Sequence, residues 1–171
     1  MALGEYGKMR MQLIGLLVLL MPFATIAKEA CPDGSGPKAA VANYLDEMQN
    51  HKFSDAFPFV TANMTDGKEL GEWAALQKLF YEGGGVNIFG IDIRAPLVDG
   101  EDSGCEARAI VPNVLKSRDK FNNQGTTEFE IYTVLKSDAG WQIDGQETLF
   151  DQVDIDKWMP GEKLPDFRDQ Y

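Results

Sequence analysis

Residues 83–97, GGGVNIFGIDIRAPL, mark the point where the sequence changes from helical to strand periodicity. Three consecutive glycines are typical of a helix end, because glycine adopts the left-handed terminal conformation without strain. The apolar residues that follow alternate with others in the order Phe89, Ile91, Ile93, Ala95 and Leu97. A period of two predicts a β-strand with one strongly apolar face. The stretch therefore separates a helical N-terminal half from a C-terminal half of strands.

Three helical segments are predicted before the glycines. The first begins at Pro37, since proline suits the first helical position, and runs to about residue 50. A short second segment, residues 53–57, stops before a proline. The third has Asp66 as its N-cap and Glu69 three residues later, which is a capping-box pattern. Its apolar stripe consists of Leu70, Trp73, Leu76 and Phe80.

Three further strands are predicted after the first. An acidic turn at residues 99–104 leads into a second strand over about residues 105–115. A third strand alternates around Phe129 and Thr133, and a turn at residues 137–140 leads to a last strand that ends near residue 149. Three helices followed by a four-stranded antiparallel sheet predict an α+β fold.

Two short phrases resemble the nuclear transport factor 2-like superfamily. They are AVANYL at residues 40–45 and VLKSDAGWQI at residues 134–143, and a phenylalanine-rich second helix accompanies them. The resemblance covers roughly residues 37–149. It implies a cone in which a curved sheet wraps the helices and leaves a pocket at the open end. The superfamily includes ketosteroid isomerases, dehydratases, transport factors and exported proteins, so the fold does not fix the function.

The N-terminus has the pattern of a signal peptide. Residues 12–27 carry no charge and follow Lys8 and Arg10, but this run is shorter than the roughly 20 residues of a spanning helix. Small residues, Thr25 and Ala27, occupy the positions that signal peptidase prefers before a cleavage site. An uncleaved signal anchor is the alternative, and Met9 and Met11 are alternative starts.

Cleavage after residue 27 divides the chain into four parts. These are a signal peptide (1–27), an N-terminal arm (28–36), the domain (37–150) and a C-terminal tail (151–171), which we expect to wrap the surface as a short helix and irregular chain. The mature protein is then expected to be periplasmic or secreted, without a stable membrane anchor.

The chain has two cysteines, Cys31 and Cys105. Export to an oxidising compartment favours a disulfide between them, which would attach the N-terminal arm to the domain. Two unpaired buried thiols are the alternative. Two thiols and the single histidine, His51, make a poor ligand set for zinc, so no metal or cofactor site is expected.

The charge of the protein limits its partners. The chain has 16 Lys and Arg against 27 Asp and Glu, a formal net charge of −11, so nucleic acid and anionic membranes are disfavoured. A basic protein partner is favoured instead, as for an immunity protein that covers a toxin with the acidic residues 99–106 and the tail. A homodimer formed through the sheet is a further alternative.

The candidate ligand site lies between the helices and the sheet. The resemblance places Tyr44 where ketosteroid isomerases have a tyrosine donor. Asp92 is the carboxylate nearest in kind to their base, but alternation puts it on the face opposite Ile91 and Ile93. His51 lies at a helix end, where a solvated role is expected. The predicted pocket lining is Tyr44, Trp73, Phe129, Thr133 and Trp141.

Function follows from what this lining contains. It is rich in aromatic surface and includes no carboxylate or histidine to move a proton. The expected function is a non-catalytic binding domain for a small apolar ligand or a protein partner. A periplasmic inhibitor of a basic toxin or enzyme and an isomerase- or dehydratase-like enzyme are the alternatives.

Overall fold

The computed structural model describes residues 30–31, 35–98 and 106–165 of the chain. Its elements are α1 (Ser35–Gln49), α2 (Phe53–Ala56), the 3-10 helix η1 (Phe57–Phe59), α3 (Leu70–Gly84), β1 (Asn87–Ile93), β2 (Arg108–Arg118), β3 (Thr126–Ser137), β4 (Gly140–Leu149) and α4 (Gln152–Trp158). The strands form one antiparallel sheet in the order β1-β2-β3-β4. This confirms the predicted α+β architecture. In the described part of the chain, every helix is too short or too polar to cross a membrane.

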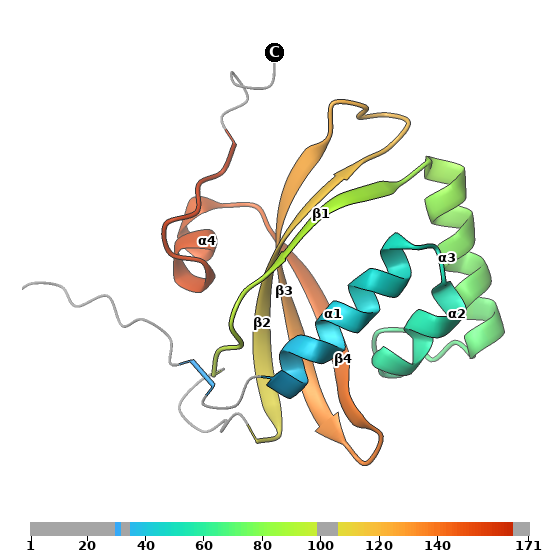
Figure 1. The fold of residues 1–171 in the computed structure, drawn as a ribbon, viewed down its shortest axis with the longest axis horizontal. Helices are drawn as coiled ribbons and strands as arrows, with labels where there is room; N and C mark the ends of the chain where they lie inside the picture. The colour runs from blue at the N-terminus through green and yellow to red at the C-terminus, as the bar shows by residue number, and fades with distance from the viewer. Residues whose placement is uncertain (1–29, 32–34, 99–105, 166–171) are drawn as a thin grey trace, which may run out of the picture.

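The sheet has a hydrophobic cluster on each side. Figure 1 shows α1, α2 and α3 on one side, called here the inner face, and α4 on the other, the outer face. The inner cluster joins Val41, Tyr44 and Leu45 of α1 to strand residues such as Val111 and Ile143. The outer cluster contains Ile110, Val114, Phe129, Ile131 and Leu149 of the sheet with Ile155, Trp158 and Met159. Both faces of the central strands are therefore buried.

Near its start, β1 departs from the predicted alternation, while Ile91 and Ile93 keep the predicted inward face. Phe89, expected on the apolar face, is 53% exposed, whereas Ile88 is only 4% exposed. The register of β1 against β2 shifts between Ile88 and Gly90, which is the signature of a β-bulge. One extra residue reverses the alternation, so Ile88 shares the inner cluster with Ile91 and Ile93.

The predicted start of the third helix is wrong. α3 begins at Leu70 with Glu69 as its N-cap residue, and Asp66 lies in a turn with φ +54°. The Asp66 carboxylate accepts a hydrogen bond from Lys68 at 2.8 Å instead of capping the helix. Of the predicted stripe only Trp73 is buried. The reason is that α3 packs mainly on α2 and η1, so a narrow strip of the helix reaches the core.

The N-terminal arm meets the sheet beside the end of β1. Ala30 forms an isolated β-bridge with Leu97, and Leu97 bridges Ile110 of β2. The backbone N–H of Cys31 donates to the Pro96 carbonyl at 3.0 Å. Cys105 and the whole acidic turn, residues 99–104, lie outside the described residues, as does the predicted signal peptide.

Candidate functional site

A carboxylate lies inside the inner cluster. Glu130 of β3 is 1% exposed. The register pairs it with Asn113 and pairs Tyr132 with Val111, which belongs to the inner cluster. Directly opposed residues of an antiparallel pair share a face, so Glu130 and Tyr132 both point toward the helices.

Three hydrogen bonds hold the Glu130 carboxylate. Its Oε2 accepts from Asn113 Nδ2 at 2.9 Å and from the Tyr132 hydroxyl at 2.8 Å. Its Oε1 accepts from Gln146 Nε2 of β4 at 2.6 Å. Asn113 and Tyr132 are buried, while Gln146 is exposed, so this polar cluster runs from the core to the surface at β4.

Burial changes the proton affinities in this cluster. Burial raises the pKa of Glu130, although the hydrogen bonds from Asn113, Tyr132 and Gln146 act against the shift. Burial also raises the pKa of the Tyr132 hydroxyl, and the nearby Glu130 charge adds to the effect. Tyr81 of α3 has its pKa raised to about 12, first by burial and then by Glu130 and Glu128. The cluster thus consists of neutral hydrogen-bond donors around one carboxylate, whose ionised form is disfavoured by burial.

One acceptor in the cluster is unfilled. The Oδ1 atom of Asn113 is buried and has no hydrogen-bond donor among the described residues. Native proteins pair nearly all such atoms, because an unpaired buried acceptor costs about 1–3 kcal/mol. A hydroxyl or N–H group brought in by a ligand would satisfy it.

The structure brings three of the five predicted pocket residues to the inner face. Tyr44 and Trp73 are buried in the inner cluster, and Trp141 packs against it while half-buried. The Tyr44 ring meets Tyr132 edge-on with centroids 6.4 Å apart. Burial raises the pKa of Tyr44 well above its usual range, and the charges of Tyr81 and Glu130 contribute.

The other two predicted residues lie on the opposite side of the sheet. Phe129 belongs to the outer cluster. Thr133 pairs with Ile110, another outer residue, so its side chain also faces outward. The prediction of one shared pocket is wrong here, because both faces of β3 are buried and alternation alone does not say which face the helices cover.

The remaining candidates lie at the surface. Asp92 is exposed and faces away from the helices, as its position in the alternation predicts, and it pairs with Arg94. His51 follows α1 with φ +59° and is exposed. Its ring lies 5.7 Å from Phe53 and 5.8 Å from Tyr81, centroid to centroid. Neither residue reaches the polar cluster around Glu130.

Sequence reasoning missed Glu130, Asn113 and Gln146. The alternation that puts Phe129 and Thr133 in the predicted pocket lining puts Glu130 on the opposite face of β3. A signal existed, because the residues that share this face include the apolar Val134 and the large aromatic Tyr132. Asn113 is a second signal, because it lies in the otherwise apolar run from Ile110 to Leu115. An asparagine buried in such a strand requires a hydrogen-bond partner.

The described residues include no group of three or more histidine, cysteine or acidic side chains placed to hold a metal ion. The polar cluster has a single carboxylate, with neutral amide and hydroxyl groups around it. Its chemistry is therefore that of hydrogen bonding and proton transfer.

No protein-family model matches the chain, and no curated protein matches it. Solved structures do resemble it. A domain of unknown function with a cystatin-like fold from Nostoc punctiforme has a TM-score of 0.50 at 17% identity, over 71% of this chain and 80% of that one. A ketosteroid isomerase-like protein from Erwinia carotovora atroseptica has a TM-score of 0.47 at 17% identity, over 70% and 98%.

A third similar structure is Bd1075 from Bdellovibrio bacteriovorus. It has a TM-score of 0.45 at 12% identity, and the match covers 64% of this chain but only 38% of that one. At these identities the likeness concerns the fold alone. Together with the strand order and the helices on the inner face, the match to the cystatin-like domain confirms the expected architecture. The chain therefore has a cystatin-like α+β fold.

Proposed function

We propose that this protein is an exported binding domain that takes a small, mainly apolar ligand between α1 and the inner face of the sheet. The observation that carries the proposal is the buried Glu130 cluster with its unfilled acceptor, Asn113 Oδ1. A purely structural network would have every member paired, because half-satisfied polar groups weaken a core. The aromatic rings of Tyr44 and Tyr132 supply apolar surface next to that acceptor.

The chemistry of the cluster specifies the ligand's polar group. Glu130 already accepts three hydrogen bonds, so it is held in place. The unfilled site is an acceptor, and a ligand hydroxyl would donate to it while the rest of the molecule displaces apolar contacts. Gln146 is exposed and donates to Glu130, so the side of the cluster at β4 is the one nearest to solvent and the expected side of ligand entry.

Binding is tested by thermal shift and calorimetry with three probe classes: hydroxylated steroids, long-chain alcohols and alkylphenols. The Tyr44 hydroxyl is close enough to the cluster to interact with the Glu130 charge, and we assign it as a second hydrogen-bond partner of the ligand's polar group. The matched variants are Tyr44→Phe on the inner face and Thr133→Val on the outer face, since each removes one hydroxyl. Tyr44→Phe should weaken binding while Thr133→Val leaves it unchanged. Equal effects of the two variants, or no binding by any probe class, would contradict the proposal.

Proton transfer is the second candidate function, and the raised pKa of Glu130 favours it. Burial moves this carboxyl toward the range in which a general base works near neutral pH. The expectation of no catalysis rested on the lack of a carboxylate in the pocket, and the inner face does contain one. Any bound probe is therefore checked for isomerisation or dehydration. Turnover that disappears in Glu130→Gln would establish that the protein is an enzyme with Glu130 as its general base.

Export and a Cys31–Cys105 disulfide are part of the proposal and rest on the sequence pattern. The contact of Cys31 with Pro96, on the segment that leads toward β2, supports the pairing because it brings the arm to the same end of the sheet. Intact mass of the exported protein, before and after reduction and alkylation, tests both parts. Protein that begins at Lys28 and adds two alkyl groups only after reduction is expected. Retention of residues 1–27 or two free thiols would contradict it.

A further inference from the structure

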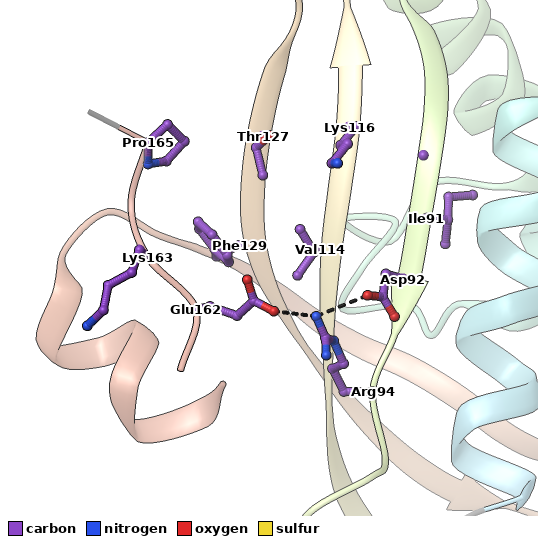
Figure 2. A pocket seen from close by; sticks show the side chains of 11 residues that line it. Ile91, Asp92, Arg94, Val114, Lys116, Thr127, Phe129, Glu162, Lys163 and Pro165 are labelled. Atoms are coloured by element: carbon purple, nitrogen blue, oxygen red, sulfur yellow. Dashed lines mark hydrogen bonds and ion pairs between the residues drawn. The ribbon is translucent and has the colours of Figure 1, made fainter. Parts of the chain in front are cut away.

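A concave region lies on the outer face, on the opposite side of the sheet from the Glu130 cluster. It is a cleft of about 550 Å³ between the sheet and the segment that follows α4. Figure 2 shows Val114 and Phe129 beneath it, with Lys163 and Pro165 on the C-terminal side. This volume lies within the usual range for small-molecule sites. The cleft thus combines an apolar floor with a charged rim.

Arg94 lies at one end of this cleft with donors to spare. Its Nη2 atom makes both of its ion pairs, to Asp92 Oδ2 at 3.0 Å and to Glu162 Oε1 (Figure 2). Its Nε atom is buried and has no acceptor among the described residues. A guanidinium group binds a carboxylate best through two parallel N–H donors, and one nitrogen alone cannot do this. Two carboxylates therefore share one nitrogen of Arg94, while its Nε donor has no acceptor among the described residues.

The rim holds one cation that the described residues leave unpaired. Arg94, Lys116 and Lys163 line the cleft with two carboxylates, Asp92 and Glu162. Arg94 pairs with both of these carboxylates, and Lys163 lies 3.8 Å from the Asp156 carboxylate. Lys116 makes no ion pair with the described residues, so it is the cation that matches a ligand with a single negative charge.

We propose that this outer cleft binds a small monocarboxylate with an apolar body. The body would lie on Val114 and Phe129, and the carboxylate would accept hydrogen bonds from Arg94 with Lys116 nearby. Glu162 occupies Arg94 in the free protein and competes with the ligand. The site is independent of the inner face, so either proposal can fail alone.

Phenylbutyrate is the probe, and phenylbutanol, which has a hydroxyl group in place of the carboxylate, is the uncharged control. Calorimetry with the full mature chain measures affinity, and amide NMR shifts locate the bound probe. Phenylbutyrate should bind at least about tenfold more tightly than the alcohol. The largest shifts should fall on Arg94, Thr127 and Glu162.

Two variants change the charge of the cleft in opposite directions. Arg94→Gln should weaken phenylbutyrate binding by about tenfold or more, whereas Glu162→Gln should strengthen it by freeing the guanidinium group. The exposed pair Lys78 and Glu82 on α3 offers matched controls. Lys78→Gln and Glu82→Gln make the same charge changes away from the cleft and should leave affinity unchanged.

Four results would overturn the proposal. These are no phenylbutyrate binding up to about 10 mM, equal affinity for the alcohol, equal effects of Arg94→Gln and Lys78→Gln, or shifts confined to the inner face. Loss of phenylbutyrate binding in Tyr44→Phe would likewise contradict the proposal, because it would show that the probe binds at the inner face. Circular dichroism of each variant confirms that it is folded before its affinity is compared.

Discussion

On the inner face of the sheet, Glu130 is buried and held by neutral donors, whereas on the outer face Arg94 lies part-exposed between two carboxylates. Burial removes water from the Glu130 carboxylate and raises its pKa, because hydrogen bonds from amides and a hydroxyl compensate only in part for the lost hydration. The outer charges keep contact with water and pair weakly. The same sheet therefore offers a hydrogen-bonding site on one side and an ion-pairing site on the other.

The largest expected effect tests whether the outer face has a core of its own. Trp158 of α4 is 7% exposed and packs in the outer cluster. Trp158→Ala should lower the free energy of unfolding by about 3–5 kcal/mol in chemical denaturation. Val153→Ala on the same helix is the control, since Val153 is 78% exposed. A loss below about 1 kcal/mol for Trp158→Ala would mean that α4 is only loosely attached.

The next effect tests which residues of β1 face inward. Ile88→Ala should cost about 2–5 kcal/mol of unfolding free energy, because Ile88 is buried in the inner cluster. Phe89→Ala should cost about 1 kcal/mol or less, since the bulge turns this larger side chain outward. A larger loss of unfolding free energy for Phe89→Ala than for Ile88→Ala in urea denaturation would contradict the bulge and indicate that β1 alternates without interruption.

A smaller effect separates the polar cluster from the apolar core around it. Asn113→Ala removes one donor from Glu130 and should cost about 1–3 kcal/mol near neutral pH. The cost should shrink as the pH falls through the raised midpoint of Glu130, because the protonated carboxyl needs this donor less. Denaturation curves across this pH range provide the measurement. A cost independent of pH would indicate a packing defect only.

The smallest effect concerns the ion pairs of the outer face. Asp92→Asn should change the unfolding free energy by about 1 kcal/mol or less, because both partners are solvated. Added salt should reduce even this difference, since it screens exposed charges. A larger, salt-independent loss would show that Arg94 is a structural centre of the outer face, which would weaken the case for a ligand there.

The sequence was a good guide to the elements and a poor guide to their faces. Proline at the start of α1, the glycines after α3 and the alternation in β3 predict the order of elements, because these signals are local. The bulge at Phe89 has no such signal, and it puts Ile88 in place of Phe89 on the inward face of β1. Both faces of β3 are buried, so the position of Glu130 depended on where α1 packs. The candidate site was therefore predicted only in its helical part.

The central claim is that Glu130 is a buried carboxyl without a cationic partner among the described residues, and its own titration tests this most directly. A carbon-detected NMR titration of the Glu130 side chain reports its pKa, with Glu130→Gln to assign the signal. The account predicts a midpoint above the ordinary 4.5. Because the folded pKa is then higher than the unfolded one, stability should also fall as pH rises through this midpoint. A midpoint at or below 4.5 would contradict the claim.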